Sequence, residues 1–93
     1  MFEISQLEID QALTKYFTSA APLRLKHYPK KQKQKYLVLY WIAKCFEKEK
    51  KYSEKEINSI ILEVTDDFVT IRRALYDYGF IDRVPDGSCY WLR

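Results

Sequence analysis

The most suggestive chemical signal in the sequence is KKQKQK, a lysine-rich run just ahead of an almost wholly apolar stretch, YLVLYWIA. Its lysines are Lys30, Lys31, Lys33 and Lys35. Clustered ammonium groups can neutralise several phosphates, and such contacts dominate the sequence-independent affinity of proteins for nucleic acids. The competing interpretation is a solvated helix end that keeps an aromatic-rich chain soluble, and the sequence alone favours it slightly. If the domain binds nucleic acid, we expect these lysines to form the phosphate contacts.

Two adjacent arginines could support phosphate contacts from a second helix. Arg73 precedes Asp77 by about one helical turn, so an intrahelical ion pair is the plain alternative for Arg73. Arg72 could pair with Asp67 or Asp82, or it could contact phosphate. Both arginines are therefore candidate nucleic-acid-binding residues that also have a structural interpretation.

The helix expected to approach nucleic acid carries the wrong charge at its start. In a DNA-reading helix-turn-helix, the N-terminal residues of the second helix approach base edges and phosphates. Here these residues are Asp66 and Asp67, which a phosphate backbone would repel. A third arginine, Arg83, flanks the short acidic turn at residues 85–87, and we expect it to be tied to a carboxylate or to the third helix. Arg83 remains a candidate for a supporting phosphate contact.

Signals for enzymatic chemistry are nearly absent. Two glycines, Gly79 and Gly87, cannot build a phosphate-cradling loop of the usual glycine-rich kind. The single histidine, His27, has no serine or cysteine nearby in the sequence. Cys45 and Cys89 are too far apart to indicate a close-spaced zinc ligand pair or a disulfide framework. We therefore expect no enzymatic activity, no cofactor and no metal site.

The distribution of charge and hydropathy limits which compartments and partners we expect for the protein. The net charge is +3, and residues 24–55 hold most of the positive side chains, whereas the segments on either side are mildly acidic. The longest apolar run, residues 36–43, is too short to span a bilayer, and residues 2–17 show no secretory signal. With two free cysteines, this composition is typical of a cytoplasmic domain that has no membrane partner.

The first half of the chain is expected to form two helices with an extended segment between them. The first helix should run over about residues 5–18, and SAAP should end it because the residue before a proline is disfavoured in a helix. An extended segment at 23–28 follows. The second helix should run from about Lys30 to Lys48 and is apolar nearly all round, so most of its circumference must be covered.

The third and fourth helices have clear start and stop signals. Ser53 as N-cap with Glu56 three residues later forms a capping box. Either Thr65 or Asp66 can cap the fourth helix, and Gly79 is a natural stop. The buried stripe of the fourth helix should consist of Phe68, Ile71, Leu75 and Tyr78.

The C-terminal stretch, FIDRVPDGSCYWLR, is typical of two strands around an Asp86-Gly87 turn, with residues 51–52 as a possible third short strand. The resulting order is helix, short strand, helix, helix and hairpin, which is the winged-helix order preceded by one extra helix. We therefore predict a mostly helical α+β, winged-helix-like fold in a single domain, 1–93. It comprises an N-terminal helical extension, 1–22, and a core, 23–93.

Residue types within YSEKEIN, DDFVTIRRALYDYGF, DR and CYW recur at the spacing of a known family. They are Tyr52, Ser53, Glu54, Lys55, Glu56, Ile57, Asn58, Asp67, Ile71, Arg72, Arg73, Leu75, Asp77, Tyr78, Gly79, Arg83, Tyr90 and Trp91. Over roughly residues 28–93 the chain resembles the prokaryotic family DUF2087. Such domains occur alone or attached to DNA-binding regulator domains, so the resemblance implies a link with transcription. It implies no activity, because none is established for the family.

Two hypotheses about function follow. The first is a transcription-associated module that binds nucleic acid, with DNA as the candidate partner, mainly through phosphate contacts. The second is a protein-interaction module with a winged-helix shape that does not bind DNA and that exposes apolar or aromatic residues from 36–41 or Tyr76. The apolar second helix and the aromatic surplus also suggest a homodimer.

Overall fold

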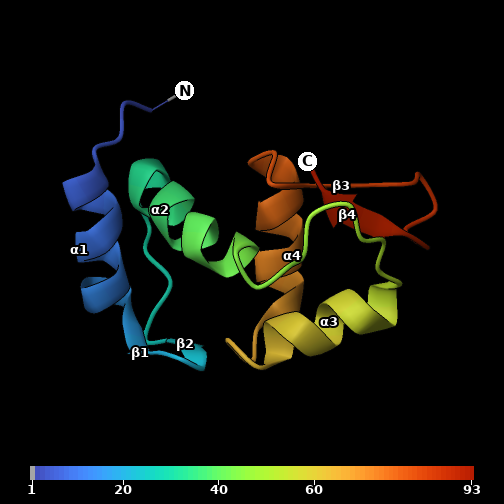
Figure 1. Cartoon of the computed structure of the whole chain (residues 1–93), viewed down its shortest axis with the longest axis horizontal. Coiled ribbons are helices and arrows are strands. Elements are labelled where there is room, and N and C mark those ends of the chain that lie inside the picture. Colours follow the sequence, from blue (N-terminus) through green and yellow to red (C-terminus); the bar gives the residue numbers. More distant parts are fainter. Residues whose placement is uncertain (1) are drawn as a thin grey trace.

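The computed structural model describes residues 2–93, which form four α-helices and two antiparallel two-stranded hairpins (Figure 1). The mostly helical α+β class predicted from the sequence is confirmed. The helices are α1 (Gln6–Tyr16), α2 (Gln32–Ala43), α3 (Glu54–Leu62) and α4 (Phe68–Asp77). The strands are β1 (Phe17–Ala20), β2 (Leu23–Leu25), β3 (Ile81–Arg83) and β4 (Tyr90–Leu92).

The first helix ends earlier than predicted because the chain turns directly into a hairpin. Helix α1 starts with a capping box in which the Ser5 hydroxyl accepts the Glu8 backbone N–H at 3.2 Å. It ends at Tyr16, since Phe17 is already extended and pairs with Leu25 across the β1–β2 hairpin. The sequence predicted the extended segment that contains β2, but it gave no signal for β1.

Helix α2 lies in the middle of the molecule and is covered on two sides. It packs against α1 on one side and α4 on the other, and Leu37, Val38, Leu39 and Ile42 are almost completely buried. The helix ends at Ala43 rather than at Lys48. Beyond this end the chain does not resume a helix, because the Glu47 backbone N–H donates to the Tyr52 hydroxyl at 2.8 Å and Glu49 adopts a φ of 61°, which no right-handed helix accepts.

The homodimer suggested by the sequence depended on an apolar α2 that needed further cover. Much of that cover comes from within the chain, because the Trp41 indole N–H donates to the Ile9 carbonyl of α1 at 2.8 Å and the Tyr16 hydroxyl bonds the Gln34 side chain at 3.1 Å. The fold therefore removes much of the physical reason for a dimer, and the dimer stays a prediction.

Helix α3 begins as its sequence indicates. The Ser53 hydroxyl accepts the Glu56 backbone N–H at 3.1 Å, and the Glu56 carboxylate accepts the Ser53 N–H at 2.8 Å. This predicted capping box is confirmed. The hydrogen bonds from Ser53 favour the charged carboxylate and lower the pKa of Glu56 below its usual value.

Replacing Ser53 with alanine should lower the free energy of unfolding by about 1 kcal/mol, because the Glu56 backbone N–H at the start of α3 loses the Ser53 hydroxyl as its partner. Urea unfolding followed by circular dichroism measures the change. Ser59→Ala is the matched control, since that exposed hydroxyl donates only to the Lys55 carbonyl within the same helix and alanine is the better helix former. Equal losses for the two variants would contradict a special role for the cap.

The fourth helix is capped by Asp67, so the expectation of Thr65 or Asp66 was wrong. The Asp67 carboxylate accepts the Thr70 backbone N–H at 3.3 Å, whereas Asp66 lies 3.4 Å from the Arg24 guanidinium. Arg24 also donates to two carbonyls at the end of α3, which holds Asp66 in the turn before the helix. Ile71 and Leu75 are buried and Phe68 and Tyr78 are partly buried, as the stripe predicted.

The C-terminal hairpin pairs β3 with β4 in the register Ile81↔Leu92, Asp82↔Trp91 and Arg83↔Tyr90. The predicted third strand is reduced to one isolated bridge, in which Tyr52 and Tyr90 exchange backbone hydrogen bonds of 2.8 Å. This bridge fixes the start of α3 beside β4. Figure 1 shows the result: α3, α4 and the hairpin surround one corner of the molecule, at the end away from α1.

Candidate functional site

The lysine run straddles the start of α2, whose N-cap is Lys31. Lys33 is the exception within the run, because its ammonium lies 2.7 Å from the Glu8 carboxylate of α1. This contact lowers the pKa of Glu8 below its usual value. Lys33 therefore holds α1 against α2 and is the least available of the run for an outside partner.

Lys30 and Lys31 are exposed and form no ion pair with any residue between 2 and 93. They border a shallow groove whose other side is formed by the end of α1. The ammonium of Lys35 lies 5.7 Å above the Tyr28 ring, which directs the side chain toward α4. Lys30 and Lys31 thus border the groove beside the end of α1, and Lys35 borders α4.

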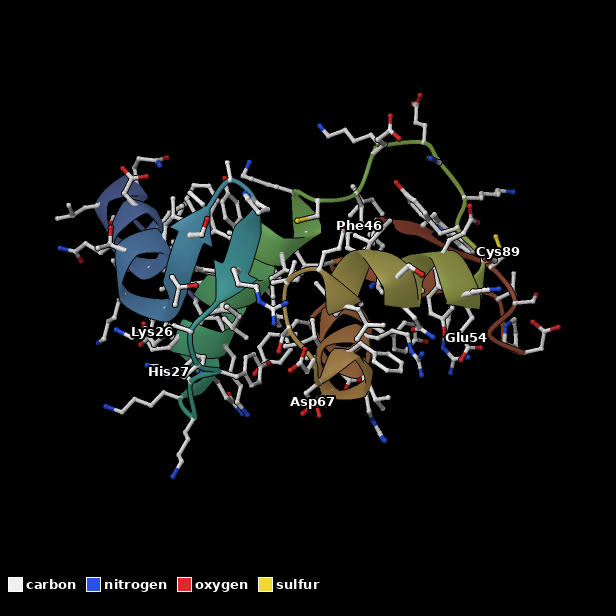
Figure 2. The ribbon with its side chains drawn as sticks, turned by 90° about the horizontal axis from the view of Figure 1, so that it is seen from below. Lys26, His27, Phe46, Glu54, Asp67 and Cys89 are labelled. Carbon is white, nitrogen blue, oxygen red and sulfur yellow. The ribbon has the colours of Figure 1, made fainter. Side chains whose placement is uncertain are left out.

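A second groove, which we call the lysine–α4 groove, joins the lysine run to the exposed side of α4. Its volume is about 370 Å³. It is lined by Tyr28, Lys35, Val69, Thr70, Arg73, Ala74, Asp77 and Tyr78. Lys35 and Arg73, which are far apart in the sequence, therefore border the same depression. In the view from below, Asp67 at the start of α4 lies between the segment with Lys26 and His27 and the start of α3 at Glu54 (Figure 2).

Arg73 has the partner that the sequence indicated. Its Nε lies 3.9 Å from the Asp77 carboxylate within α4, and its side chain is 83% exposed. A pair so long and so exposed contributes little to stability, and it leaves the guanidinium available to other anions.

Arg72 has different partners from those the sequence suggested. It pairs neither with Asp67 nor with Asp82, because its Nη1 donates to Asn58 Oδ1 at 2.6 Å and lies 3.3 Å from a Glu54 oxygen. Only 20% of the Arg72 side chain is exposed. Arg72 thus links α4 to α3, and Glu54, which the sequence assigned only to the first turn of α3, is one of the two anchors.

Arg83 is not tied to a carboxylate within residues 2–93, contrary to expectation. It donates to the Pro85 carbonyl at 3.1 Å, and its guanidinium carbon lies 5.1 Å from the centre of the Tyr76 ring of α4. The hairpin turn brings β3 alongside the end of α4, so that an aromatic face takes the place of the expected counter-ion.

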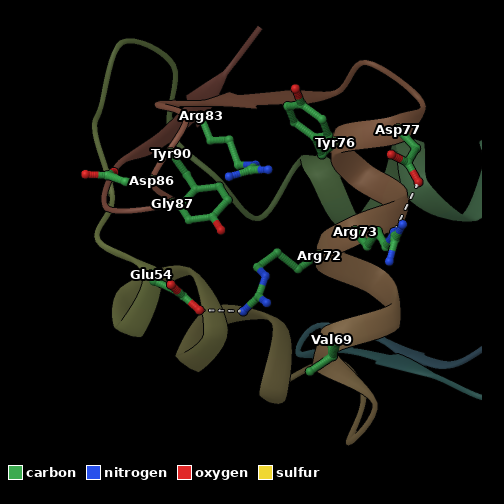
Figure 3. A pocket seen from close by; sticks show the side chains of 10 residues that line it. All are labelled: Glu54, Val69, Arg72, Arg73, Tyr76, Asp77, Arg83, Asp86, Gly87 and Tyr90. Atoms are coloured by element: carbon green, nitrogen blue, oxygen red, sulfur yellow. Dashed lines mark ion pairs between the residues drawn. The ribbon is translucent and has the colours of Figure 1, made fainter.

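These arginines border a larger depression between α3, α4 and the C-terminal hairpin, which we call the arginine hollow (Figure 3). Its volume is about 550 Å³. It is lined by Glu54, Val69, Arg72, Arg73, Tyr76, Asp77, Arg83, Asp86, Gly87 and Tyr90. Arg73 borders both this hollow and the lysine–α4 groove, so the two depressions meet on the exposed side of α4.

Residues that carry the family resemblance gather in the arginine hollow. Glu54, Arg72, Arg73, Asp77, Arg83 and Tyr90 line it, and Asn58 holds Arg72 from behind. A family model described as an uncharacterised protein conserved in bacteria, DUF2087, matches residues 24–92. The chain belongs to the DUF2087 family. The predicted resemblance is therefore confirmed.

Other comparisons add no relative to this DUF2087 domain. No curated protein and no solved structure matches the chain. Within residues 2–93, no helix is both long and apolar enough to cross a membrane. Of the residues that line the arginine hollow, the sequence predicted only Arg72, Arg73 and Arg83 as nucleic-acid-binding residues, and Tyr76 as part of a protein-interaction surface. The signal available for Tyr90 was its place in the DUF2087 pattern.

Proposed function

We propose that the domain is a winged-helix module associated with transcription that binds the phosphate backbone of nucleic acid along the exposed side of α4. The observation that carries the proposal is the lysine–α4 groove, where Lys35 and Arg73 border the same depression. The element order α2, α3, α4 and hairpin supports the winged-helix assignment. The unpaired Cys45 and Cys89 suit a cytoplasmic setting, and we assign the domain no catalytic role.

The expected phosphate contacts come from side chains that remain available along α4 and just before the start of α2. Lys30, Lys31, Lys35 and Arg73 can neutralise phosphates, whereas Lys33 is held by Glu8. Arg72 and Arg83 lie in the arginine hollow beside α4, so they can add only supporting contacts to a phosphate backbone that follows α4. About four phosphate contacts predict a slope of roughly −3 to −4 in a plot of log binding constant against log salt.

The start of α4 favours binding without sequence preference. Asp67 is committed to capping the helix, and Asp66 lies beside Arg24. These contacts reduce the repulsion of phosphate by the two aspartates, and they leave the Thr70 hydroxyl as the one side-chain donor in the first turn that could read a base edge. We therefore expect similar affinities for duplexes of different sequence.

The test is a fluorescence-anisotropy titration of labelled duplex DNA with the double variant Lys30→Glu and Lys31→Glu. We expect about tenfold weaker binding and a salt slope less steep by about two, because two phosphate contacts are lost. The matched control is Lys48→Glu with Lys51→Glu, which makes the same change in net charge. The loop that carries these lysines lies on the opposite side from Lys26 and His27 (Figure 2). Equal losses in both double variants would contradict a localised binding face, and no binding by the folded wild type at low salt would refute the proposal.

One observation favours the alternative of a protein-interaction module that uses the same shape. Val69 and Tyr76, both on α4, are 51% and 40% exposed, and both border the arginine hollow. Exposed apolar side chains beside a depression are typical of surfaces that dock another protein. This alternative gains support if the wild-type protein is indifferent to DNA even at low salt.

A further inference from the structure

The arginine hollow contains a guanidinium group, that of Arg83, that has no ion-pair partner within residues 2–93. Arg83 is partly buried and forms no ion pair with any residue of 2–93, although Asp86 stands nearby in the same turn. The Asp86 carboxylate instead accepts the Ser88 N–H at 2.9 Å, and Figure 3 shows it pointing out of the hollow. A partly desolvated guanidinium without a counter-ion is costly, so the site favours an anion from outside.

The guanidinium groups of Arg72 and Arg83 keep hydrogen-bond donors free. The contacts of Arg72 with Asn58 and Glu54 both involve Nη1, and the hydrogen bond of Arg83 to Pro85 also uses Nη1. Within residues 2–93, Nη2 of each arginine has no hydrogen-bond partner. A guanidinium presents its N–H donors in a planar fork that matches the oxygens of a phosphate.

The two free forks converge on one place. Figure 3 shows Arg72 reaching in from α4 and Arg83 from β3, with the Tyr90 hydroxyl directed into the space between them. The Tyr90 residue is only 5% exposed, so its position is fixed by packing. A phenol hydroxyl can donate a third hydrogen bond to an oxyanion held by the two arginines.

Gly87 keeps this space open. A Cβ atom at this position would lie 3.6 Å from the Tyr90 hydroxyl and 3.7 Å from Arg83 Nη1. Gly87 also has a φ of 76°, in the left-handed region that favours glycine. Glu54 Oε2 would lie 3.7 Å from the same Cβ atom, so the turn brings bare backbone close to two donor side chains and one carboxylate.

The three carboxylates that line the hollow equal its three arginines in number, but only two of them form ion pairs with these arginines. Glu54 contacts Arg72 at 3.3 Å, and Asp77 lies beside Arg73 at the outer edge. Asp86 points out of the hollow and forms no ion pair with Arg83. The unpaired guanidinium of Arg83 and the two free forks suit a phosphate group within reach of the Tyr90 hydroxyl.

We propose that the arginine hollow binds the phosphate group of a small phosphorylated molecule between Arg72 and Arg83. The volume of about 550 Å³ lies within the range of small-molecule sites, roughly 300–1,000 Å³, and exceeds the needs of phosphate alone. The remainder of the molecule lies toward Val69 and Tyr76, whose side chains supply apolar contact. This inference does not depend on nucleic-acid binding by the lysines.

Isothermal titration calorimetry with inorganic phosphate, adenosine 5′-monophosphate and adenosine tests the proposal. We expect the first two to bind and adenosine not to bind. Arg83→Gln should weaken binding of the monophosphate about tenfold or more, Arg83→Lys should weaken it less, and Tyr90→Phe should weaken it severalfold, through loss of one hydrogen bond to the anion. Circular dichroism verifies that each variant is folded.

Arg93→Gln is the matched control, because it removes an arginine charge outside the hollow, where Arg93 lies 3.9 Å from Asp82. Affinity for the monophosphate should not change. A folded wild-type protein that binds neither phosphate nor the monophosphate at millimolar concentration would overturn the proposal, as would equal losses for Arg83→Gln and Arg93→Gln.

Two further experiments distinguish a small-molecule site in the arginine hollow from nucleic-acid binding by Lys30 and Lys31 and from binding of the ends of nucleic-acid strands. The Lys30→Glu, Lys31→Glu variant should retain full affinity for the monophosphate even if its binding of duplex DNA is lost. A single-stranded oligonucleotide with a 5′-phosphate should compete no better than the same oligonucleotide without it. Competition that requires the 5′-phosphate, with no binding of the free monophosphate, would assign the hollow to nucleic-acid ends and overturn a small-molecule ligand.

Discussion

Replacing Leu75 with alanine is expected to lower the free energy of unfolding by about 3 kcal/mol. Leu75 is completely buried in α4, the helix that packs against both α2 and α3. Truncation removes apolar contacts and leaves a cavity that the surrounding helices can fill only in part. Because a domain of this length is stable by roughly 5–14 kcal/mol in total, the loss is a large share of its stability.

Urea unfolding of the wild type and the Leu75→Ala variant measures this difference. Leu7→Ala provides the matched control. The Leu7 side chain is 64% exposed on α1, so its truncation should change the free energy of unfolding little. A Leu75→Ala variant as stable as Leu7→Ala would show that α4 is not packed as the structure describes.

The second large effect concerns Arg72, whose replacement with leucine should cost about 2 kcal/mol. The side chain is mostly buried, and its loss leaves Asn58 without the 2.6 Å hydrogen bond that joins α3 to α4. The ion pair with Glu54 adds less, because half of the Glu54 side chain is exposed to water. Most of the expected loss in the free energy of unfolding therefore comes from the Asn58 side chain, which is left without its hydrogen-bond donor.

Arg73→Leu separates this effect from a general loss of positive charge. The neighbouring arginine is 83% exposed and its ion pair is 3.9 Å long, so its replacement should change stability by less than about 0.5 kcal/mol. A double-mutant cycle with Asn58→Ala should give a coupling energy of at least about 1 kcal/mol between Arg72 and Asn58. A coupling near zero would contradict the contact.

Local signals in the sequence predicted local structure well. The capping box at Ser53, the stripe of α4 and the C-terminal hairpin each depend on residues within a few positions of one another, and each is present. The end of α2 could not be predicted in this way. It depends on a hydrogen bond from Glu47 to the side chain of Tyr52, which is itself held in place by β4.

The candidate site shows the same division between local and distant contacts. Arg73 has the intrahelical partner that a spacing of four residues indicates. The partners of Arg72 and Arg83 come from other elements, and charge alone could not distinguish Glu54 from Asp67 or Asp82 as the anchor of Arg72. Similarly, no pattern indicated that an aromatic face, Tyr76, would adjoin Arg83.

Helix α1 lies outside the segment that the family model matches, but it packs against α2 inside that segment. The family match starts at Arg24, yet the indole of Trp41 donates its hydrogen bond to α1, and Lys33 and Gln34 also contact that helix. The segment that relatives share by sequence is therefore smaller than the unit that must fold together. A relative that keeps the matched segment but lacks a helix equivalent to α1 must cover the same side of α2 by other means.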